Sequence, residues 1–271
     1  VDLKPTGQHY MEDLEKAGGL VTILREIRKL LNLDALTVTG DTLGENIKAA
    51  APGWKQDIVR PFSDPIFKGG SIAVLRGNLC PQGAIIKQAA ASPKLMSHTG
   101  RAVVFESLED LANRIDDPKL DVKEDDILVM QNAGPKGAPG MPEAGYIPIP
   151  KKLAQKGVKD MIRISDARMS GTAFGAIVLH VTPESALGGP LALVKTGDKI
   201  KLDVPNRKLE LLVSDEELGA RRAVWKKPRA RKEDTRGYRK LFMTEVTQAD
   251  RGCDFEFLIP PQDSKVPRSG R

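Results

Sequence analysis

Short β-prone runs separated by turn residues dominate the chain from residue 72 onward, and none of them exceeds six residues. Eight such runs with few helical segments between them favour a barrel or sandwich over a doubly wound sheet. The last two runs alternate apolar and charged residues, which predicts strands with one face in water. The eight predicted strands are 72–75, 102–105, 127–130, 161–164, 176–181, 191–194, 199–203 and 208–213.

Helical signals between these runs are few. We expect helices at 83–91, at 107–115 with Ser107 as N-cap, and at 151–156. Ser214 followed three residues later by Glu217 predicts a last helix, which leads into a basic segment.

The first 64 residues have a different pattern. Apolar residues recur every three or four positions over 10–31, which predicts helix, with a break at Gly18-Gly19. A short β-prone run follows at 35–39, and the pair Thr42 and Glu45 predicts another capped helix. Helix, strand and helix without closing partners indicate the end of an α/β domain.

The fold class is therefore mixed α/β, mainly a β-barrel-like C-terminal domain with short helices, preceded by the end of an α/β domain. We predict three parts: residues 1–64 as the end of the first domain, 65–218 as the barrel-like domain, and 219–271 as a basic connector and tail.

Positive charge is concentrated in one segment. Residues 219–241 hold ten Lys or Arg and two acidic residues, whereas residues 1–218 hold 28 basic and 29 acidic residues. A basic run can bind nucleic acid, but it has only two aromatics and no known reader motif around it. We favour a solvated connector or a strap on an acidic surface of the same protein.

The remaining composition excludes several classes. Two cysteines form neither a disulfide framework nor a four-thiolate metal site. No apolar run is long enough to span a bilayer and no secretory leader opens the chain, so we expect a cytoplasmic protein without membrane contact. The first residue is Val1 rather than Met, which indicates a processed or truncated product.

Three turn-rich loops follow predicted strands, where sites concentrate. They are the first loop (76–83), the glutamate loop (131–143) and the serine loop (165–175). None contains a phosphate-binding or dinucleotide-binding glycine motif. Glu143 alone supplies too few donors for a metal, and Ser170 has no His beside it in sequence. From these residues alone, we infer a β-rich domain with a polar, glycine-lined cleft.

The order of residues in these loops identifies a protein family more specifically than their amino-acid composition does. The stretches GNLCPQGAIIK, NAGPKGAPGMPE and SDARMSGTAFG resemble the C-terminal half of the dihydroxyacid and sugar-acid dehydratases. MEDLEKAGGL, DALTVTGDTLGEN and QADRGCDFEFL are similar to the same family, so the resemblance covers nearly the whole chain. SDARMSG resembles the sugar-acid branch, closest to the pentonate dehydratases, more than the TDGRFSG of the amino-acid-biosynthetic branch.

The resemblance implies a hydro-lyase that converts a 2,3-dihydroxy acid to a 2-keto-3-deoxy acid. It implies an iron–sulfur cluster as Lewis acid, Mg²⁺ to orient the substrate, and a serine alkoxide that removes the C2 proton. On this sequence the base falls on Ser170 and the metal-binding glutamate on Glu143. Thr172 is a candidate substrate contact. The resemblance also implies a homo-oligomer, either a dimer or a tetramer.

The family's cluster cysteines and most Mg²⁺ ligands belong to an N-terminal half that this sequence does not include. Cys80 and Cys253 lie outside the cluster motifs, so we expect no cluster in this chain alone. The leading hypothesis is thus a hydro-lyase part that needs the N-terminal half of the same enzyme. The alternative is a non-catalytic binding or scaffold protein that kept the barrel, and a nucleic-acid-binding module ranks third.

Overall fold

The computed structural model describes residues 1–51, 54, 56–171, 173–228 and 232–259. The chain forms two compact units, Val1–Ser71 and Ile72–Arg271. The sequence-based boundary was expected at 64/65. Each unit is described here by itself.

The first unit contains three short helices. These are α1 (Met11–Lys16), α2 (Gly19–Ile27), extended by a 3₁₀ turn η1 (Arg28–Leu30), and α3 (Leu43–Ala49). Gly18 separates the first two with a left-handed φ of 99°, which confirms the predicted break. The capping box of Thr42 and Glu45 is also confirmed. The strand predicted at 35–39 is wrong: only an isolated bridge forms there.

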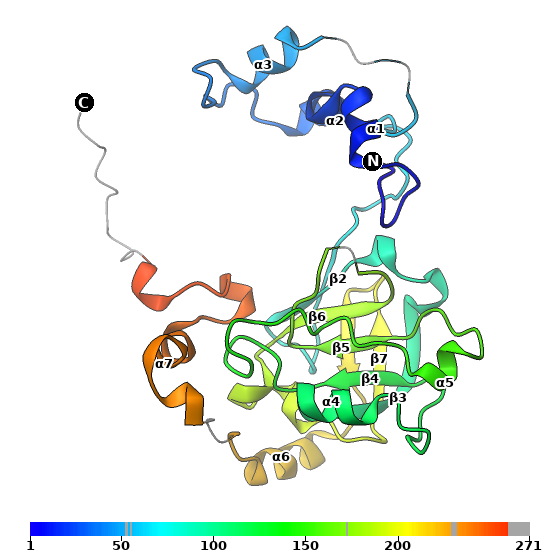
Figure 1. Ribbon diagram of the computed structural model, residues 1–271, viewed down its shortest axis with the longest axis vertical. Helices are drawn as coiled ribbons and strands as arrows, with labels where there is room; N and C mark the ends of the chain where they lie inside the picture. Colours follow the sequence, from blue (N-terminus) through cyan, green and yellow to red (C-terminus); the bar gives the residue numbers. More distant parts are fainter. Residues whose placement is uncertain (52–53, 55, 172, 229–231, 260–271) are drawn as a thin grey trace. The chain divides into compact units, whose positions relative to one another are not determined.

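The second unit is an eight-stranded sheet that closes on itself (Figure 1). The spatial order is β1-β2-β6-β5-β4-β3-β7-β8. Strands β3 to β6 pair in parallel and the other pairs are antiparallel. The strands are β1 (Ala73–Leu75), β2 (Gly83–Ile86), β3 (Ser97–Phe105), β4 (Ile127–Met130), β5 (Arg163–Ser165), β6 (Ile177–Thr182), β7 (Lys199–Asp203) and β8 (Lys208–Leu211).

The residue after β1 closes the barrel. Arg76 donates its backbone N–H to the Arg207 carbonyl at 2.9 Å and accepts from the Leu209 N–H at 3.1 Å. This parallel bridge joins the two ends of the strand order. Because this bridge joins the two edge strands at one point, it nearly closes the sheet and shortens the exposed edge that an open sheet would present. The predicted barrel-like fold is confirmed.

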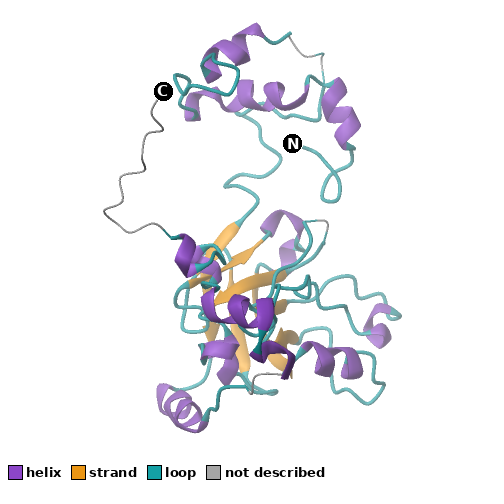
Figure 2. Ribbon diagram, turned by 60° about the vertical axis from the view of Figure 1, so that its left-hand side comes forward, coloured by secondary structure: helices purple, strands orange, loops and turns teal. Residues whose placement is uncertain are grey.

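Strand β4 shows how the core divides. Ile127 and Val129 belong to the apolar cluster inside the barrel, whereas Leu128 and Met130 belong to a second cluster on its outer side. Helices α4 (Leu108–Arg114) and α5 (Lys151–Ala154) each contribute a leucine to that outer cluster. Strand β4 is buried on both faces, which explains its uninterrupted apolar sequence. Figure 2 shows the helices of this unit arranged around its strands.

Two predicted elements in the second unit are wrong. The helix predicted at 83–91 is strand β2 followed by a 3₁₀ turn, and the strand predicted at 191–194 is the 3₁₀ helix η5 (Pro190–Leu193). Strand β2 was not predicted, and the strand predicted at 191–194 does not form, so the number of strands is still eight. The predicted alternation of β7 and β8 is confirmed by their burial patterns. The other 3₁₀ helices are η2 (Gln88–Ala90), η3 (Pro93–Leu95), η4 (Ser185–Leu187), η6 (Lys232–Thr235), η7 (Ala249–Arg251) and η8 (Glu256–Leu258).

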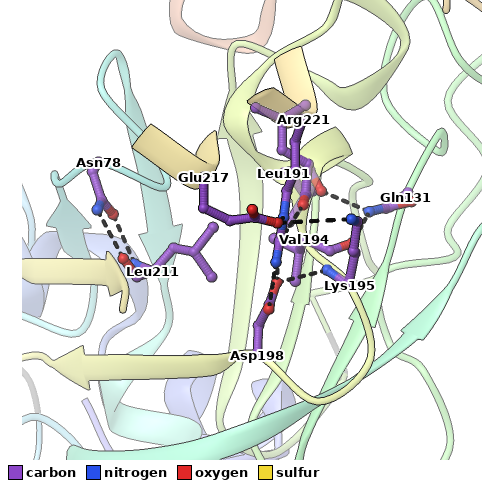
Figure 3. Close-up of polar contacts among 10 residues, drawn as sticks. Asn78, Gln131, Leu191, Val194, Lys195, Asp198, Leu211, Glu217 and Arg221 are labelled. Atoms are coloured by element: carbon purple, nitrogen blue, oxygen red, sulfur yellow. Dashed lines mark hydrogen bonds and ion pairs between the residues drawn. The ribbon is translucent and has the colours of Figure 1, made fainter. Parts of the chain in front are cut away.

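The start of the basic segment is anchored on the barrel (Figure 3). Arg221, on α6 (Asp215–Val224), pairs with Asp198 at 2.5 Å and with Glu217 at 2.7 Å. The predicted Ser214 cap of this helix is confirmed. Further along, on α7 (Gly237–Glu245), Arg239 pairs with Asp234. Arg221 thus joins the start of the basic segment to Asp198 of the barrel domain, whereas the Arg239–Asp234 pair lies within the segment itself. No helix among the described residues has the length and apolarity that a membrane span requires.

The N-cap of α4 allows a stability test. The Ser107 hydroxyl accepts the Asp110 N–H at 3.1 Å. Replacing Ser107 with Ala leaves that N–H without its capping acceptor, and we expect a loss of about 1 kcal/mol in the free energy of unfolding of the second unit. Urea denaturation of both proteins measures the difference. An unchanged midpoint would show that the cap contributes nothing here.

Candidate active site

The glutamate loop and the serine loop meet at Arg168. This residue donates from Nε to the Met141 carbonyl at 2.6 Å and from Nη1 to Glu143 Oε1 at 2.8 Å. Its own carbonyl accepts the Gly145 N–H at 2.7 Å. These three bonds fix the Glu143 carboxylate beside the serine loop, and both side chains of the ion pair remain about half exposed. Glu143 is therefore held in place but open to solvent.

Ser170 lies two residues beyond Arg168, so their Cα atoms are at most about 7 Å apart. Ser170 is partly buried, and its carbonyl accepts the Ala173 N–H at 3.1 Å. Next to it, the Gly171 carbonyl accepts from Lys87 Nζ at 3.0 Å. Glu143 and Ser170 thus sit on two loops that the structure brings together, while Thr172 lies outside the described residues.

The first loop makes its contacts elsewhere. The Asn78 amide donates to the Leu211 carbonyl at 2.9 Å and accepts the Leu211 N–H at 2.7 Å (Figure 3). The Gln82 N–H donates to Thr182, at the end of β6. Lys87, which contacts the serine loop, lies at the opposite end of β2. The first loop does not share the contacts of the other two, because the turn between the antiparallel strands β1 and β2 is held against β8.

Two buried carboxylates that sequence reasoning missed hold the start of the glutamate loop. Asp166 accepts the Ala133 and Ser185 N–H groups at 2.9 and 2.8 Å. Glu184 accepts the N–H groups of Lys136 and Gly137 and the amide of Gln248. Burial raises the pKa of both acids. A loop rich in Gly and Pro forms few hydrogen bonds within itself, so its backbone N–H groups need acceptors from elsewhere in the chain. This need was the one signal in the sequence that buried acceptors such as Asp166 and Glu184 exist.

His180 was also missed. Gly83 pairs with Thr182 whereas Ile85 pairs with Leu179, so β6 carries one extra residue and forms a bulge there. His180 has a φ of 53° in this bulge, and its buried Nδ1 has no hydrogen-bond partner among the described residues. Burial and, secondarily, Arg168 lower its pKa. Bulges often turn a side chain toward a site, and the backbone N–H of His180 donates to the carbonyl of Ala167, next to Arg168, at 3.2 Å.

The two thiols do not fit an iron–sulfur cluster. Cys80 is fully buried, its Sγ donates to the Leu75 carbonyl at 3.6 Å, and burial raises its pKa to about 12. Cys253 also has a raised pKa, because of burial. The common cluster types are held by four cysteine thiolates, and this chain has only two cysteines. Nor do the described residues bring three His, Cys, Asp or Glu side chains into one metal-binding group.

This ligand count gives a prediction for the 271-residue chain by itself. After anaerobic reconstitution with iron and sulfide, we expect no cluster absorbance and no turnover of pentonates. Visible spectroscopy with iron and sulfide analysis is the measurement. Stoichiometric iron and sulfide in the desalted protein would contradict the assignment of Cys80 and Cys253 as structural thiols.

Comparison with known proteins identifies the family. Residues 57–253 match the family "Dihydroxy-acid/6-phosphogluconate dehydratase C-terminal", and residues 1–46 match the corresponding N-terminal family. The chain therefore belongs to the dihydroxy-acid/6-phosphogluconate dehydratases, as the loop motifs indicated.

Individual relatives are named dehydratases. The chain is 50% identical over 260 residues to L-arabinonate dehydratase of Rhizobium leguminosarum bv. trifolii, covering 95% of this chain and 44% of that protein. It is 49% identical over 261 residues to 6-deoxy-6-sulfo-D-gluconate dehydratase of Pseudomonas putida (95% and 45%). It is 42% identical over 253 residues to dihydroxy-acid dehydratase of Syntrophobacter fumaroxidans (93% and 44%). The chain spans less than half the length of these relatives.

Proposed function

We propose that this chain is the C-terminal part of a hydro-lyase that converts a 2,3-dihydroxy sugar acid to a 2-keto-3-deoxy acid. The observation that carries the proposal is the joining of the glutamate and serine loops through Arg168, which places a carboxylate and a serine from separate loops in one region. Family membership supports the reaction class. The complete enzyme, in this proposal, is this chain together with the N-terminal half that its relatives carry.

The sugar-acid branch is favoured over branched-chain dihydroxy acids. The relatives named for arabinonate and sulfogluconate are 50% and 49% identical to this chain, whereas the dihydroxy-acid dehydratase is 42% identical. The SDARMSG motif in the serine loop supports the same branch. Thr172, next to this loop's Gly171, is proposed as a substrate contact.

Ser170 acts on C2 of the substrate. Its alkoxide takes the C2 proton, the hydroxyl on C3 departs, and the enol that forms tautomerises to the 2-keto-3-deoxy acid. Proton and hydroxide together make the water that is lost. A C2 proton beside a carboxylate is weakly acidic, so positive charge near the developing enolate lowers the barrier. Arg168, two residues before Ser170, is a cation that this chain contributes to the region.

Glu143 is the residue of this chain that we propose to contact a cofactor. We propose that this carboxylate contributes one ligand to Mg²⁺, while the other ligands and the iron–sulfur cluster belong to the N-terminal half. A homo-oligomer of two or four copies and a cytoplasmic location are part of the same proposal.

The test is an assay of the complete enzyme on L-arabinonate, 6-deoxy-6-sulfo-D-gluconate and a branched dihydroxy acid, with detection of the 2-keto product. We expect turnover of a sugar acid in preference to the branched acid. Turnover of the branched dihydroxy acid alone would assign the protein to the amino-acid-biosynthetic branch of the family. Failure to form a keto acid from any of the three, in a preparation loaded with cluster and Mg²⁺, would favour the non-catalytic binding or scaffold protein.

A further inference from the structure

A fully buried arginine connects the two loops of the candidate site. Arg163, the first residue of β5, is 1% exposed. Its guanidinium donates to four carbonyls and one carboxylate. The acceptors are Met161 O (3.2 Å, from Nε), Tyr146 O and Ile147 O (3.2 and 3.3 Å, from Nη1), and Phe174 O and Asp160 Oδ1 (3.3 and 2.9 Å, from Nη2).

The position of these acceptors in the chain matters more than their number. Tyr146 and Ile147 follow Glu143 by three and four residues, and Phe174 follows Ser170 by four. One planar group therefore binds carbonyls that lie just after the glutamate loop and at the end of the serine loop. Because its five N–H donors have fixed relative directions, the guanidinium also fixes how these two loop ends lie relative to each other.

Asp160 is the acidic partner of Arg163. Its side chain is 6% exposed and pairs with Arg163. The same carboxylate accepts the Ala176 N–H at 2.9 Å and the Ser92 N–H at 2.9 Å. Asp160 thus neutralises the buried guanidinium and also holds the residue where the serine loop enters β6.

Gly175 shows how closely the serine loop approaches this pair. A Cβ built at this residue would lie 1.9 Å from Arg163 Nη2 and 2.6 Å from Asp160 Oδ1, and its φ is 122°. No side chain fits between the loop and the ion pair. The loop backbone is therefore packed directly on the guanidinium, with no intervening side chain that could adjust.

A buried ion pair is weak evidence for stability, because well-packed apolar residues often stabilise a core as well or better. What apolar residues cannot do is donate hydrogen bonds to the three carbonyls of Tyr146, Ile147 and Phe174. We propose that Arg163, with Asp160, is the positioning residue that sets the placement of Glu143 relative to Ser170. This inference rests on the proposed function for its catalytic consequence, but its structural part can be tested without activity.

The first experiment is hydrogen exchange on the 271-residue chain carrying Arg163→Lys. Lysine keeps the charge but lacks the planar fork. We expect the Gly145 and Gly175 amides, which bond to Arg168 O and Ala90 O, to exchange at least about tenfold faster. The Arg76 and Leu209 amides at the barrel closure should stay within about threefold of wild type.

Arg101→Lys is the matched control. Arg101 is also a strand arginine paired with a buried aspartate, Asp126, but its bonds go to residues 121 and 126, outside both loops. It should leave the Gly145 and Gly175 amides unchanged. Uniform acceleration of loop and barrel amides in Arg163→Lys, or acceleration at only one of the two loops, would overturn the proposal. If that variant does not fold, Asp160→Asn is measured in its place and judged by the same criteria.

The second experiment measures catalysis in the complete enzyme. A displacement of about 1 Å between reacting groups typically costs about 100-fold in rate, so we expect Arg163→Lys to lower kcat/KM by that order. Arg101→Lys should keep near-native kcat/KM. Equal losses in the two variants would overturn the positioning role. If wild-type enzyme dehydrates no sugar acid, the proposed function fails, while the exchange data still decide whether Arg163 holds the two loops together.

Discussion

Replacing Ser170 with Ala in the complete enzyme should lower kcat by about 10²–10⁴-fold while changing KM little. In the proposed mechanism the Ser170 alkoxide takes the C2 proton, and losing a positioned base removes an interaction made only in the transition state. The backbone should not move, since the carbonyl of residue 170 still accepts the Ala173 N–H and alanine adopts any conformation that serine does.

Ser107→Ala is the matched control for this variant. It removes a serine hydroxyl of the same domain whose hydrogen bond is made to the Asp110 N–H at the cap of α4, and not to a backbone group of either site loop. Steady-state kinetics on a sugar acid, with cluster and metal analysis of each protein, separates loss of the base from loss of a cofactor. Near-native turnover of Ser170→Ala with intact cofactors would mean that another group takes the proton.

The sequence predicted a strand best where the strand's own residue pattern reflects which of its two faces are buried. Strand β4 is an unbroken apolar run because both of its faces are covered, and β7 and β8 alternate because one face is wet. The run 191–194 has the same apolar composition but begins after Pro190, which starts a 3₁₀ helix. Gly83–Ile86 reads as helix in isolation and becomes a strand through its pairing with β1 and β6. Such pairing is decided by distant residues.

The site shows the same division. The resemblance of the loop motifs to the dehydratase family implied Glu143 and Ser170, because each motif lies in one continuous segment of the sequence. Arg163, Asp166 and Glu184 were missed, since each acts on backbone groups far away in sequence: the Glu184 carboxylate contacts Lys136, 48 residues earlier. A charged residue inside an apolar run, as Arg163 is in MIRIS, signals a buried partner but does not say which.

Glu143→Gln should affect the complete enzyme differently from Ser170→Ala. Glutamine preserves the shape of the side chain and an oxygen for Arg168, but it removes the charge that a hard cation requires. We expect Mg²⁺ affinity to fall by at least the 10–100-fold that is typical of losing even an outer-shell partner, and KM to rise with it. Metal analysis after dialysis, together with kinetics at graded Mg²⁺ concentrations, measures both effects.

The alternative explanation is loss of the Glu143–Arg168 ion pair alone. Both side chains of that pair are about half exposed, and exposed pairs contribute only about 0–1 kcal/mol, which is too little for a 100-fold change in metal affinity. Arg168→Gln breaks the same pair while leaving the carboxylate, so it should retain Mg²⁺ far better than Glu143→Gln does. If the two variants lose Mg²⁺ equally, the carboxylate serves the contact between the loops rather than the metal.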